Sequence, residues 1–406
     1  MATWATGHRP RWRRRGQAPW QAEALEGRHL LSVAPVRFSR PIAVPFNSEP
    51  NSAALADFNR DGRLDLAVAN GSRQLGVALG NGNGTFRPAQ YFQAGLGFLS
   101  STLSVTTGDF NNDGRPDLVA SNFGVNSISV LLNTSTGNSL SFAPPLEHGA
   151  GAEPVFVAVG DFDRDGKLDV ATANIAADPN NSVGILLGNG NGTFQDLRFV
   201  AAGANPNSLA VGDFNRDGIP DLAVTYSASA ASNPSTDHVG ILLGNGDGTF
   251  QTVRFFPVGK TPISVAVGDF DRDGILDLAV ANPNSNNVSV LLGDGEGNFS
   301  TRATYRTGQK PLSVMAADLN GDGKLDLAVA NSASNNVKIL LGNGDGTFFP
   351  RNPRQNLFPA GSRPNGKMAV GPIARGYLPD LAVPNANGQV SVLLNRTRLR
   401  IRVAHR

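Results

Sequence analysis

The chain has 406 residues, of which 40% are hydrophobic, with 47 Gly, 26 Pro and no Cys. The absence of Cys excludes disulfides and thiolate metal sites, and the many turn-forming residues favour an all-β protein. No run of 18 apolar residues occurs, so we predict no membrane-spanning helix. Residues 1–37 hold seven Arg and residues 396–406 hold five, which leaves a body with 23 basic and 31 acidic residues. This acidic body argues against a nucleic acid partner.

The N-terminal segment, residues 1–35, is predicted to be a disordered, Arg-rich targeting segment. It lacks the apolar stretch of a secretory signal peptide. Its residues 25–32, Leu-Glu-Gly-Arg-His-Leu-Leu-Ser, resemble an element found near the N-terminus of many large exported planctomycete proteins. This resemblance implies an exported bacterial protein, located outside the cell or at its surface.

An acidic motif then recurs along the chain, with the pattern Asp-x-(Asn/Asp)-x-Asp-Gly-x-x-Asp. Six copies begin at Asp57, Asp109, Asp161, Asp213, Asp269 and Asp318. A seventh, eroded copy occupies residues 372–380, and consecutive copies are 49 to 56 residues apart. A fixed period of this length predicts one array of repeats instead of two or three separate domains.

Each repeat is predicted to form four short strands, as its fifth copy illustrates. Residues 264–268 precede the acidic motif, 276–282 and 287–292 follow it, and the last strand runs over about 299–307. Gly and Asn separate these β-branched runs, as in hairpins. The second strand is almost wholly apolar, which is typical of a strand buried on both faces. Four antiparallel strands in about 50 residues predict one blade of a β-propeller.

The two ends of the repeat array are predicted to meet. The last repeat ends at Leu394 without a fourth strand, whereas residues 38–44 resemble the fourth strand at 250–256. An N-terminal strand that completes the last blade would remove exposed sheet edges. We therefore predict a closed seven-bladed propeller over residues 36–395, followed by a basic tail at 396–406.

The repeated phrase Ala-Val-Gly-Asp-Phe-Asp-Arg-Asp-Gly-x-Leu-Asp-Leu-Ala-Val-Ala at 266–281 resembles the FG-GAP and VCBS-type repeats of bacterial surface proteins and of the integrin α-subunit propeller. The resemblance covers roughly residues 36–395. It implies that each acidic loop joins the first and second strands of a blade and binds calcium on one face of the ring.

The residues themselves also indicate a hard cation. Oxygen side chains at motif positions 1, 3, 5 and 9, a carbonyl at position 7 and Gly at position 6 suit calcium. One such motif is often only a turn, but six copies gather carboxylates that repel one another unless a cation neutralises them. The expected ligands are Asp57, Asn59, Asp61, Arg63, Asp65, Asp109, Asn111, Asp113, Arg115, Asp117, Asp161, Asp163, Asp165, Lys167, Asp169, Asp213, Asn215, Asp217, Ile219, Asp221, Asp269, Asp271, Asp273, Ile275, Asp277, Asp318, Asn320, Asp322, Lys324 and Asp326.

Two comparisons limit this prediction. An EF-hand would need flanking helices and a Glu at position 12, where the six copies have Val, Ala or Thr. The seventh copy has Pro372, Ala374 and Gly376 in place of acids and keeps only Asp380. We therefore expect about six calcium ions and an empty seventh loop, with loops three and five binding most tightly because each has four carboxylates.

A second phrase, Leu-Gly-Asn-Gly-(Asn/Asp)-Gly-Thr-Phe, recurs at 79–86, 187–194, 243–250 and 341–348. It lacks the Lys-Ser/Thr ending and the following helix of a phosphate-binding loop. We predict a turn between the third and fourth strands whose Phe packs between blades.

No arrangement of residues nominates a catalytic site. Three of the five His lie in the tails, and no nucleophile motif surrounds any Ser. All three Trp lie in the N-terminal segment, at 4, 12 and 20, which disfavours a glycan-binding surface of aromatic platforms. The prediction is a monomeric, non-enzymatic adhesion or interaction module whose partner is a protein or polysaccharide at the cell surface. The alternatives are a lectin-like propeller and a polysaccharide lyase or dehydratase.

Three connections are longer than the fold needs: 93–104, 175–181 and 226–238. All lie on the face opposite the acidic loops, and long loops often carry function. The last two belong to neighbouring blades, so we expect a partner-binding rim there, formed by Asp178, Tyr226, Asp237 and His238.

Overall fold

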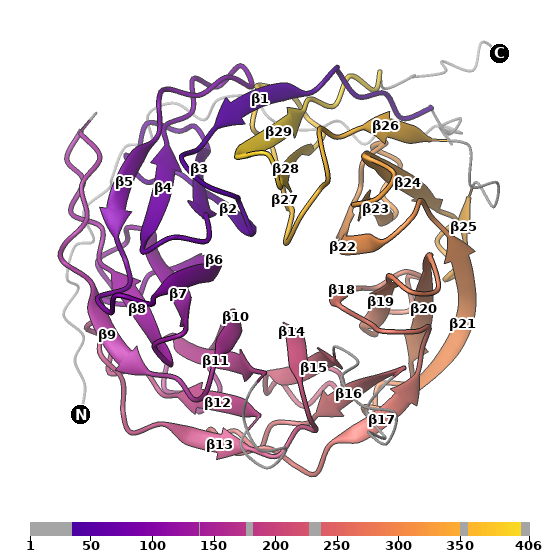
Figure 1. Cartoon of the computed structure of the whole chain (residues 1–406). Helices are drawn as coiled ribbons and strands as arrows, with labels where there is room; N and C mark the ends of the chain where they lie inside the picture. The colour runs from indigo at the N-terminus through magenta and orange to yellow at the C-terminus, as the bar shows by residue number, and fades with distance from the viewer. Residues whose placement is uncertain (1–34, 138, 176–181, 227–236, 350–355, 399–406) are drawn as a thin grey trace, which may run out of the picture. The chain divides into compact units, whose positions relative to one another are not determined.

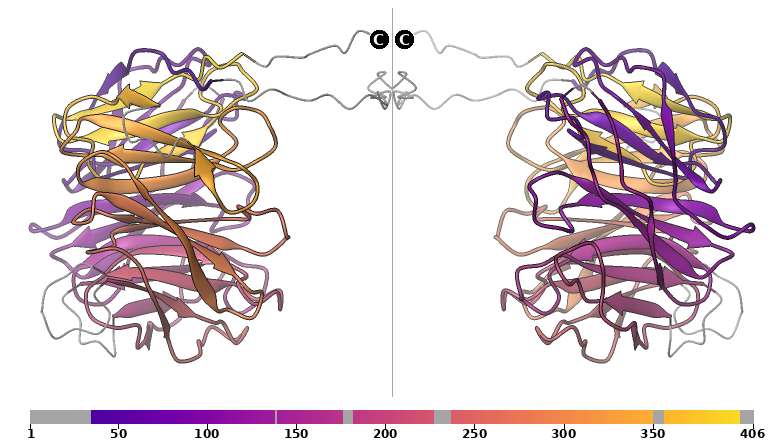
Figure 2. Two further views of the ribbon diagram at one scale, coloured as in Figure 1. Left: turned by 90° about the vertical axis from the view of Figure 1, so that its right-hand side faces the viewer. Right: turned by 90° about the vertical axis from the view of Figure 1, so that its left-hand side faces the viewer.

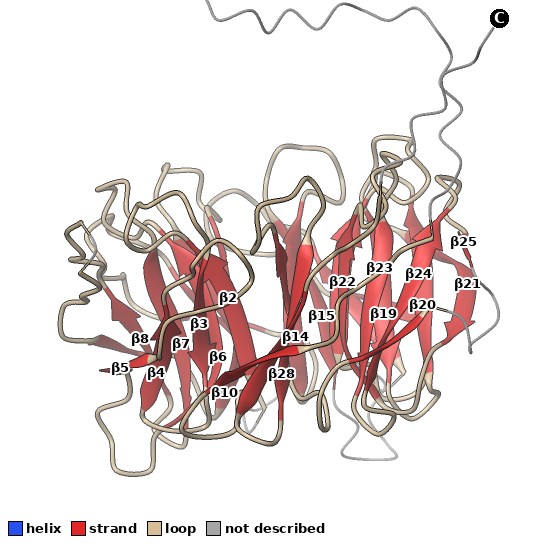
Figure 3. Ribbon diagram, turned by 90° about the horizontal axis from the view of Figure 1, so that it is seen from above, coloured by secondary structure: helices blue, strands red, loops and turns tan. Residues whose placement is uncertain are grey.

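The computed structural model describes residues 35–137, 139–175, 182–226, 237–349 and 356–398. They belong to one compact unit, and all their regular structure is β-strand, so the figure coloured by secondary structure shows only strands and loops (Figure 3). The predicted segment 1–35 and the basic tail at 396–406 lie almost wholly outside the described residues. Seven sheets surround a common axis (Figure 1), which confirms the predicted all-β, seven-bladed propeller.

Every blade is an antiparallel sheet; in six blades the strands follow chain order from the axis outward, and in blade seven β27, β28 and β29 are followed by β1. The inner strands are β2 (Ser52–Ala56), β6 (Ser101–Gly108), β10 (Pro154–Gly160), β14 (Pro206–Gly212), β18 (Ser264–Gly268), β22 (Pro311–Ala317) and β27 (Ala369–Gly371). The second strands are β3 (Asp65–Ala69), β7 (Asp117–Phe123), β11 (Asp169–Asn174), β15 (Asp221–Tyr226), β19 (Asp277–Asn282), β23 (Asp326–Asn331) and β28 (Asp380–Asn385). The third strands are β4 (Gln74–Ala78), β8 (Ser127–Leu131), β12 (Val183–Leu186), β16 (His238–Leu242), β20 (Asn287–Gly293), β24 (Asn336–Gly342) and β29 (Gln389–Leu393). The outer strands are β5 (Gln90–Gln93), β9 (Leu146–Gly149), β13 (Arg198–Val200), β17 (Arg254–Pro257), β21 (Phe299–Arg306), β25 (Phe348–Phe349), β26 (Leu357–Pro359) and β1 (Ile42–Pro45).

The predicted strand boundaries hold closely in blade five, which contains β18 to β21. The inner strand begins and ends at the predicted residues, and the other strands differ by about one residue at an end. In blade six the outer strand is divided, since β25 and β26 both pair with β24 on either side of residues 350–355. Antiparallel strands reverse direction at each step, so the first-to-second and third-to-fourth connections share one face of the ring. The side views show connections gathered at both faces (Figure 2).

The N-terminal strand closes the ring as predicted. β1 pairs antiparallel with β29, with Ile42 opposite Val392 and Pro45 opposite Gln389. Val36 and Phe38 precede β1 and pack into the seam between blades six and seven. The segment from Val36 to Pro45 therefore joins the last blade on two sides, and the third strand of that blade is not left as an edge.

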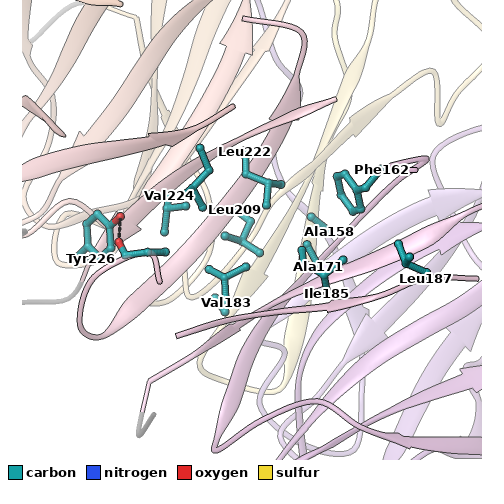
Figure 4. Close-up of a cluster of buried hydrophobic side chains, with 13 residues drawn as sticks. Ala158, Phe162, Ala171, Val183, Ile185, Leu187, Leu209, Leu222, Val224 and Tyr226 are labelled. Atoms are coloured by element: carbon teal, nitrogen blue, oxygen red, sulfur yellow. Dashed lines mark hydrogen bonds between the residues drawn. The ribbon is translucent and has the colours of Figure 1, made fainter. Parts of the chain in front are cut away.

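The hydrophobic core consists of seven clusters, one at each seam between neighbouring blades. At the seam of blades three and four, Ala171 and Ile185 from one sheet face Leu209 and Leu222 from the other (Figure 4). All residues of the second strands β11, β15, β19, β23 and β28 are buried. Burial on both faces explains why these strands do not alternate between apolar and polar residues.

A Phe–Phe contact repeats across the seams on the face of the acidic loops. The ring of Phe162, at motif position 2 of blade three, lies 5.7 Å from that of Phe250 in the third-to-fourth turn of blade four. Phe110–Phe194 and Phe270–Phe348 pack in the same way. The backbone joins the same elements, because the amide of Gly248 donates to the carbonyl of Phe162 at 3.1 Å. These contacts confirm that the Gly-rich phrase is a turn whose Phe packs between blades.

Candidate metal sites

Each acidic motif forms the connection between the first and second strands of a blade. In blade one this connection is residues 57–64, between β2 and β3. Gly at motif position 6 has a φ between 77° and 83° in all six loops. Gly is the residue that adopts this left-handed conformation without strain. The sharp turn that it permits brings positions 1, 3 and 5 together.

Backbone hydrogen bonds fix the acidic side chains inside the loop. In blade one, Asp57 accepts hydrogen bonds from the amides of Asp61 (3.0 Å) and Gly62 (2.7 Å). Asp61 in turn accepts a hydrogen bond from the amide of Arg63 at 3.0 Å. The equivalent bonds occur in the other five loops. The six loops therefore share one conformation that is built from their own residues.

Loops three and five gather three carboxylates each. In these two loops, oxygen atoms from positions 1, 3 and 5 all lie within 4.8 Å of one another; the residues are Asp161, Asp163, Asp165, Asp269, Asp271 and Asp273. Burial, followed by the charge of the position 5 carboxylate, raises the pKa of Asp163 and of Asp271. Carboxylates gathered this closely suit a divalent cation that prefers oxygen ligands. The residues of these two loops therefore fit calcium.

The other four loops have Asn at position 3. In three of them the amide nitrogen donates to the position 5 carboxylate, as Asn111 does to Asp113 at 2.9 Å. In loop six, the buried Nδ2 of Asn320 has no hydrogen-bond partner. Each Asn offers one neutral oxygen to a cation, so these loops have one charge fewer than loops three and five.

Loops three and five differ from each other in the residue at position 7. The Lys167 ammonium lies 2.7 Å from Asp165 in loop three, and the Arg115 guanidinium lies 2.6 Å from Asp113 in loop two. Position 7 of loop five is Ile275, which brings no positive charge to Asp273. Loop five thus combines three clustered carboxylates with a neutral position 7.

We therefore expect loop five to have the highest calcium affinity. Ile275→Lys should weaken the tightest binding event by roughly threefold, the size of an exposed ion pair. Lys167→Ile, the reciprocal change, should strengthen binding at loop three. Calorimetric calcium titrations of the two variants and the unaltered chain measure both effects. An unchanged titration for Ile275→Lys would contradict this order of affinity.

The Asp at position 9 has a second, structural role that the sequence analysis missed. Asp65 is fully buried at the start of β3. It accepts hydrogen bonds from the amide of Phe58 (2.9 Å) at the start of the loop and from that of Gly80 (2.8 Å) after β4. Both bonds recur at the other five motifs. The position 9 carboxylate therefore ties the loop to the end of the third strand.

In the seventh blade, the Asp at position 9 keeps this structural role although the other acids of the motif are missing. Asp380 accepts hydrogen bonds from the amides of Ala374 (2.8 Å) and Asn395 (2.6 Å), although Pro372, Ala374 and Gly376 supply no side-chain oxygen. Retention of this Asp in the eroded copy was the signal in the sequence for a structural role.

Burial raises the pKa of all position 9 carboxyls, and most of them are affected further by the other acids of their loop. The pKa rises to about 6 for Asp65, Asp117, Asp169 and Asp221, and to about 7 for Asp277 and Asp326. The pKa of Asp380 is also raised by burial, but the nearby Arg396 opposes the shift. A cation in the six loops would lower these pKa values by favouring the ionised form.

One of the four residues expected at a partner-binding rim, Tyr226, does not lie on the surface. Tyr226 is fully buried, and its hydroxyl donates to the carbonyl of Ala202 at 2.5 Å (Figure 4), so it cannot contact a partner. Asp237 accepts a hydrogen bond from the amide of Thr261 at 3.0 Å, and His238 begins β16. Asp178 lies outside the described residues. Tyr226 was misassigned because it was taken as the first residue of the connection 226–238, whereas it is the last residue of β15.

The connection between β5 and β6, the first of the three long connections predicted, exposes large apolar side chains. β6 begins at Ser101, so the connection from β5 is residues 94–100 and not the predicted 93–104. Leu96, Phe98 and Leu99 in it are 58%, 89% and 75% exposed. Arg73 lies over the Phe98 ring, 5.6 Å from its centroid. Sequence reasoning identified the connection by its length but did not single out these residues.

Fold and loops together define a repeat propeller with an acidic, cation-compatible loop in six of its seven blades. The FG-GAP-like repeat matches residues 57–120, 109–172, 174–224, 227–280, 269–329 and 318–373. These matches span more than half of the chain, which therefore belongs to the FG-GAP-like repeat family. No curated protein sequence matches the chain.

Solved structures share the fold. Two structures of BBS1N in complex with ARL6DN, soaked with mercury and with lead, contain a chain with 12% and 14% identity and TM-scores of 0.56 and 0.57. They cover 90% and 91% of this chain and all of that chain. An Agrocybe aegerita lectin that recognises non-reducing terminal N-acetylglucosamine has 20% identity and a TM-score of 0.51, over 75% of this chain and 80% of that one. At these identities the likeness establishes the fold alone.

Proposed function

We propose that this chain is a calcium-binding, non-enzymatic interaction module that works outside the cell or at its surface. The observation that carries the proposal is the repetition of one preformed oxygen-rich loop in six blades, together with membership of the FG-GAP-like repeat family. None of the described residues forms a helix that could cross a membrane. Calcium at extracellular concentrations suits loops of three or four carboxylates.

In each loop, the side-chain oxygens of positions 1, 3 and 5, the carbonyl of position 7 and the Asp at position 9 would hold the ion. Calcium would supply positive charge that offsets the repulsion among the carboxylates. The loop is also joined to the next blade, because the position 2 carbonyl accepts the amide of that blade's turn, as Phe214 does from Gly297. Cation binding would thereby stabilise the seams between blades as well as the loops themselves.

Metal analysis and chelation test the calcium part of the proposal. The purified chain should contain about six calcium ions, and chelation should lower its melting temperature by more than 10 °C. Each site at a calcium concentration of 100 Kd stabilises the native state by about 2.7 kcal/mol, and six sites add. A chain in which all six position 1 Asp residues are changed to Ala is the control and should not respond to chelator. Fewer than three ions per chain would contradict the proposal.

The proposal that the chain binds a partner and catalyses no reaction rests on the chemistry of the acidic loops. The loop carboxylates accept backbone hydrogen bonds and are assigned to the ion, which leaves them unsuited to acid–base catalysis. A lectin remains the second class to be tested, and the described residues include no Trp platform for a sugar. Binding to a glycan array that depends on calcium would favour the lectin, and turnover of a polysaccharide would favour an enzyme.

The connection 94–100 is the surface on which we expect a protein partner. Three adjacent exposed apolar side chains are more than a monomeric surface usually gathers at one loop. Replacing Leu96, Phe98 and Leu99 together by Ser should abolish binding of the purified chain to its own cell envelope without changing calcium content or melting temperature. The matched control replaces the exposed Tyr377 and Phe349 by Ser. Retained binding in the triple variant would exclude this surface, and loss on shortening 227–236 would favour the rim of blades three and four.

A further inference from the structure

A cavity with a volume of about 460 Å³ is lined by the inner strands of six blades, β2, β6, β10, β14, β18 and β22, and by residues 365–367, which precede β27 in blade seven. This volume is within the range of small-molecule sites. The walls are formed mainly by Leu, Val, Ile, Ala and Met side chains, together with Ser, Thr and Asn. Among the described residues that line the cavity, Lys367 is the only charged or titratable one. The cavity thus combines an apolar wall with one positive charge.

Lys367 replaces a residue with a recurrent structural role. The residue five positions before each acidic motif is Ser in five blades: Ser52, Ser104, Ser208, Ser264 and Ser313. In four of these, the Ser hydroxyl accepts a hydrogen bond from a backbone amide of the next blade at 3.1–3.3 Å. The hydroxyl therefore lies at the seam and helps to hold neighbouring blades together.

At this position, blade three has Phe156 and blade seven has Lys367 in place of Ser. The Lys367 ammonium lies 4.9 Å from the centre of the Phe156 ring. Blades three and seven are not neighbours, since β10 and β27 lie on opposite sides of the ring (Figure 1). The two side chains, one from β10 and one from the segment before β27, must therefore extend into the cavity and meet across it.

This pair leaves the positive charge without an acidic partner. No carboxylate forms an ion pair with Lys367 anywhere in the described part of the chain. An aromatic ring compensates an ammonium less fully than a carboxylate does. Burial lowers the pKa of Lys367 to about 8, which is the mark of an incompletely compensated charge. A Met at this position would span the same cavity without that cost.

We propose that the central cavity binds a small organic anion, a carboxylate on an apolar body. Its carboxylate pairs with the Lys367 ammonium, and its apolar part packs against Phe156 and the aliphatic walls such as Ile263 and Leu312. None of the residues that line the cavity belongs to an acidic motif. The proposed site therefore shares no residue with the expected calcium ligands or with the surface at 94–100.

Calorimetry of the full chain with straight-chain carboxylates from butanoate to decanoate tests the proposal. At least one should bind, and the alcohol of the same length should bind at least tenfold more weakly, because it brings no charge to the ammonium. Affinity should be constant below pH 8 and should fall above it, as Lys367 loses its proton. Equal affinity for acid and alcohol, or no binding by any member of the series, would overturn the proposal.

Variants separate the charge from the shape of the cavity. Lys367→Met should lower carboxylate affinity at least tenfold, and Lys367→Arg should retain most of it. Phe156→Ser, which restores the residue of the other blades, should weaken binding of the longer carboxylates. Lys260→Met removes an exposed lysine and should have no effect. Melting temperatures check that each variant is folded, and ¹³C-dimethyl-lysine NMR should show only the Lys367 signal shifting with ligand. Unchanged affinity in a folded Lys367→Met variant would also overturn the proposal.

Discussion

Deletion of residues 1–44 should lower the melting temperature by more than 10 °C, whereas deletion of residues 1–35 should leave it unchanged. The longer deletion removes most of β1, the outer strand of blade seven, and exposes β29 as an edge. It also removes Val36 and Val44, which are 4% and 5% exposed, and Phe38, whose ring packs 5.2 Å from that of Phe358. Burial of three such side chains stabilises by about 5–8 kcal/mol.

Thermal unfolding followed by circular dichroism measures this difference, and deletion of residues 399–406 provides the control for loss of a chain end. Both deletions should be compared in calcium and in chelator, because blade seven has no complete acidic loop. The destabilisation should therefore be similar in the two conditions. Equal melting temperatures for the two N-terminal deletions would show that the ring does not depend on β1.

Most of the architecture was predictable because it depends on local, repeated features. The Gly and Asn turns fix the hairpins, and the apolar second strand indicates burial on both faces. The boundaries of β18 were therefore predicted to the residue. Closure of the ring was predictable for a different reason, since a missing fourth strand at Leu394 and an extra strand before blade one were both visible in the sequence.

The candidate sites were predictable only where they repeat. The acidic loops stand out because six copies share one pattern, but the hydrogen bonds of Asp65 to Phe58 and Gly80 join residues whose proximity depends on the folded blade. The contact of Lys367 with Phe156 joins two blades on opposite sides of the ring, so no local pattern reports it. Tyr226 was placed on a rim although it is equivalent to Asn174 and Asn282, the last residues of the second strands in other blades, and its ring lies in the core.

The role of the position 9 carboxylate can be separated from calcium by comparing two blades. Asp380→Ala should be destabilising by about 2–6 kcal/mol, because it leaves the amides of Ala374 and Asn395 without an acceptor, at about 1–3 kcal/mol each. Its loop offers no other carboxylate or amide oxygen, so the loss should be the same in calcium and in chelator. Thermal unfolding in the two conditions measures it.

Asp326→Ala in blade six makes the matched comparison. It removes the acceptor of the amides of Leu319 and Gly342, and it also removes an expected calcium ligand. Its destabilisation should therefore equal that of Asp380→Ala in chelator and exceed it in calcium, since the variant also forfeits the binding free energy of one ion. Equal losses for Asp326→Ala in both conditions would mean that position 9 only ties the loop to the third strand. A silent Asp380→Ala would instead mean that this tie contributes nothing, and that the carboxylate is retained for another reason.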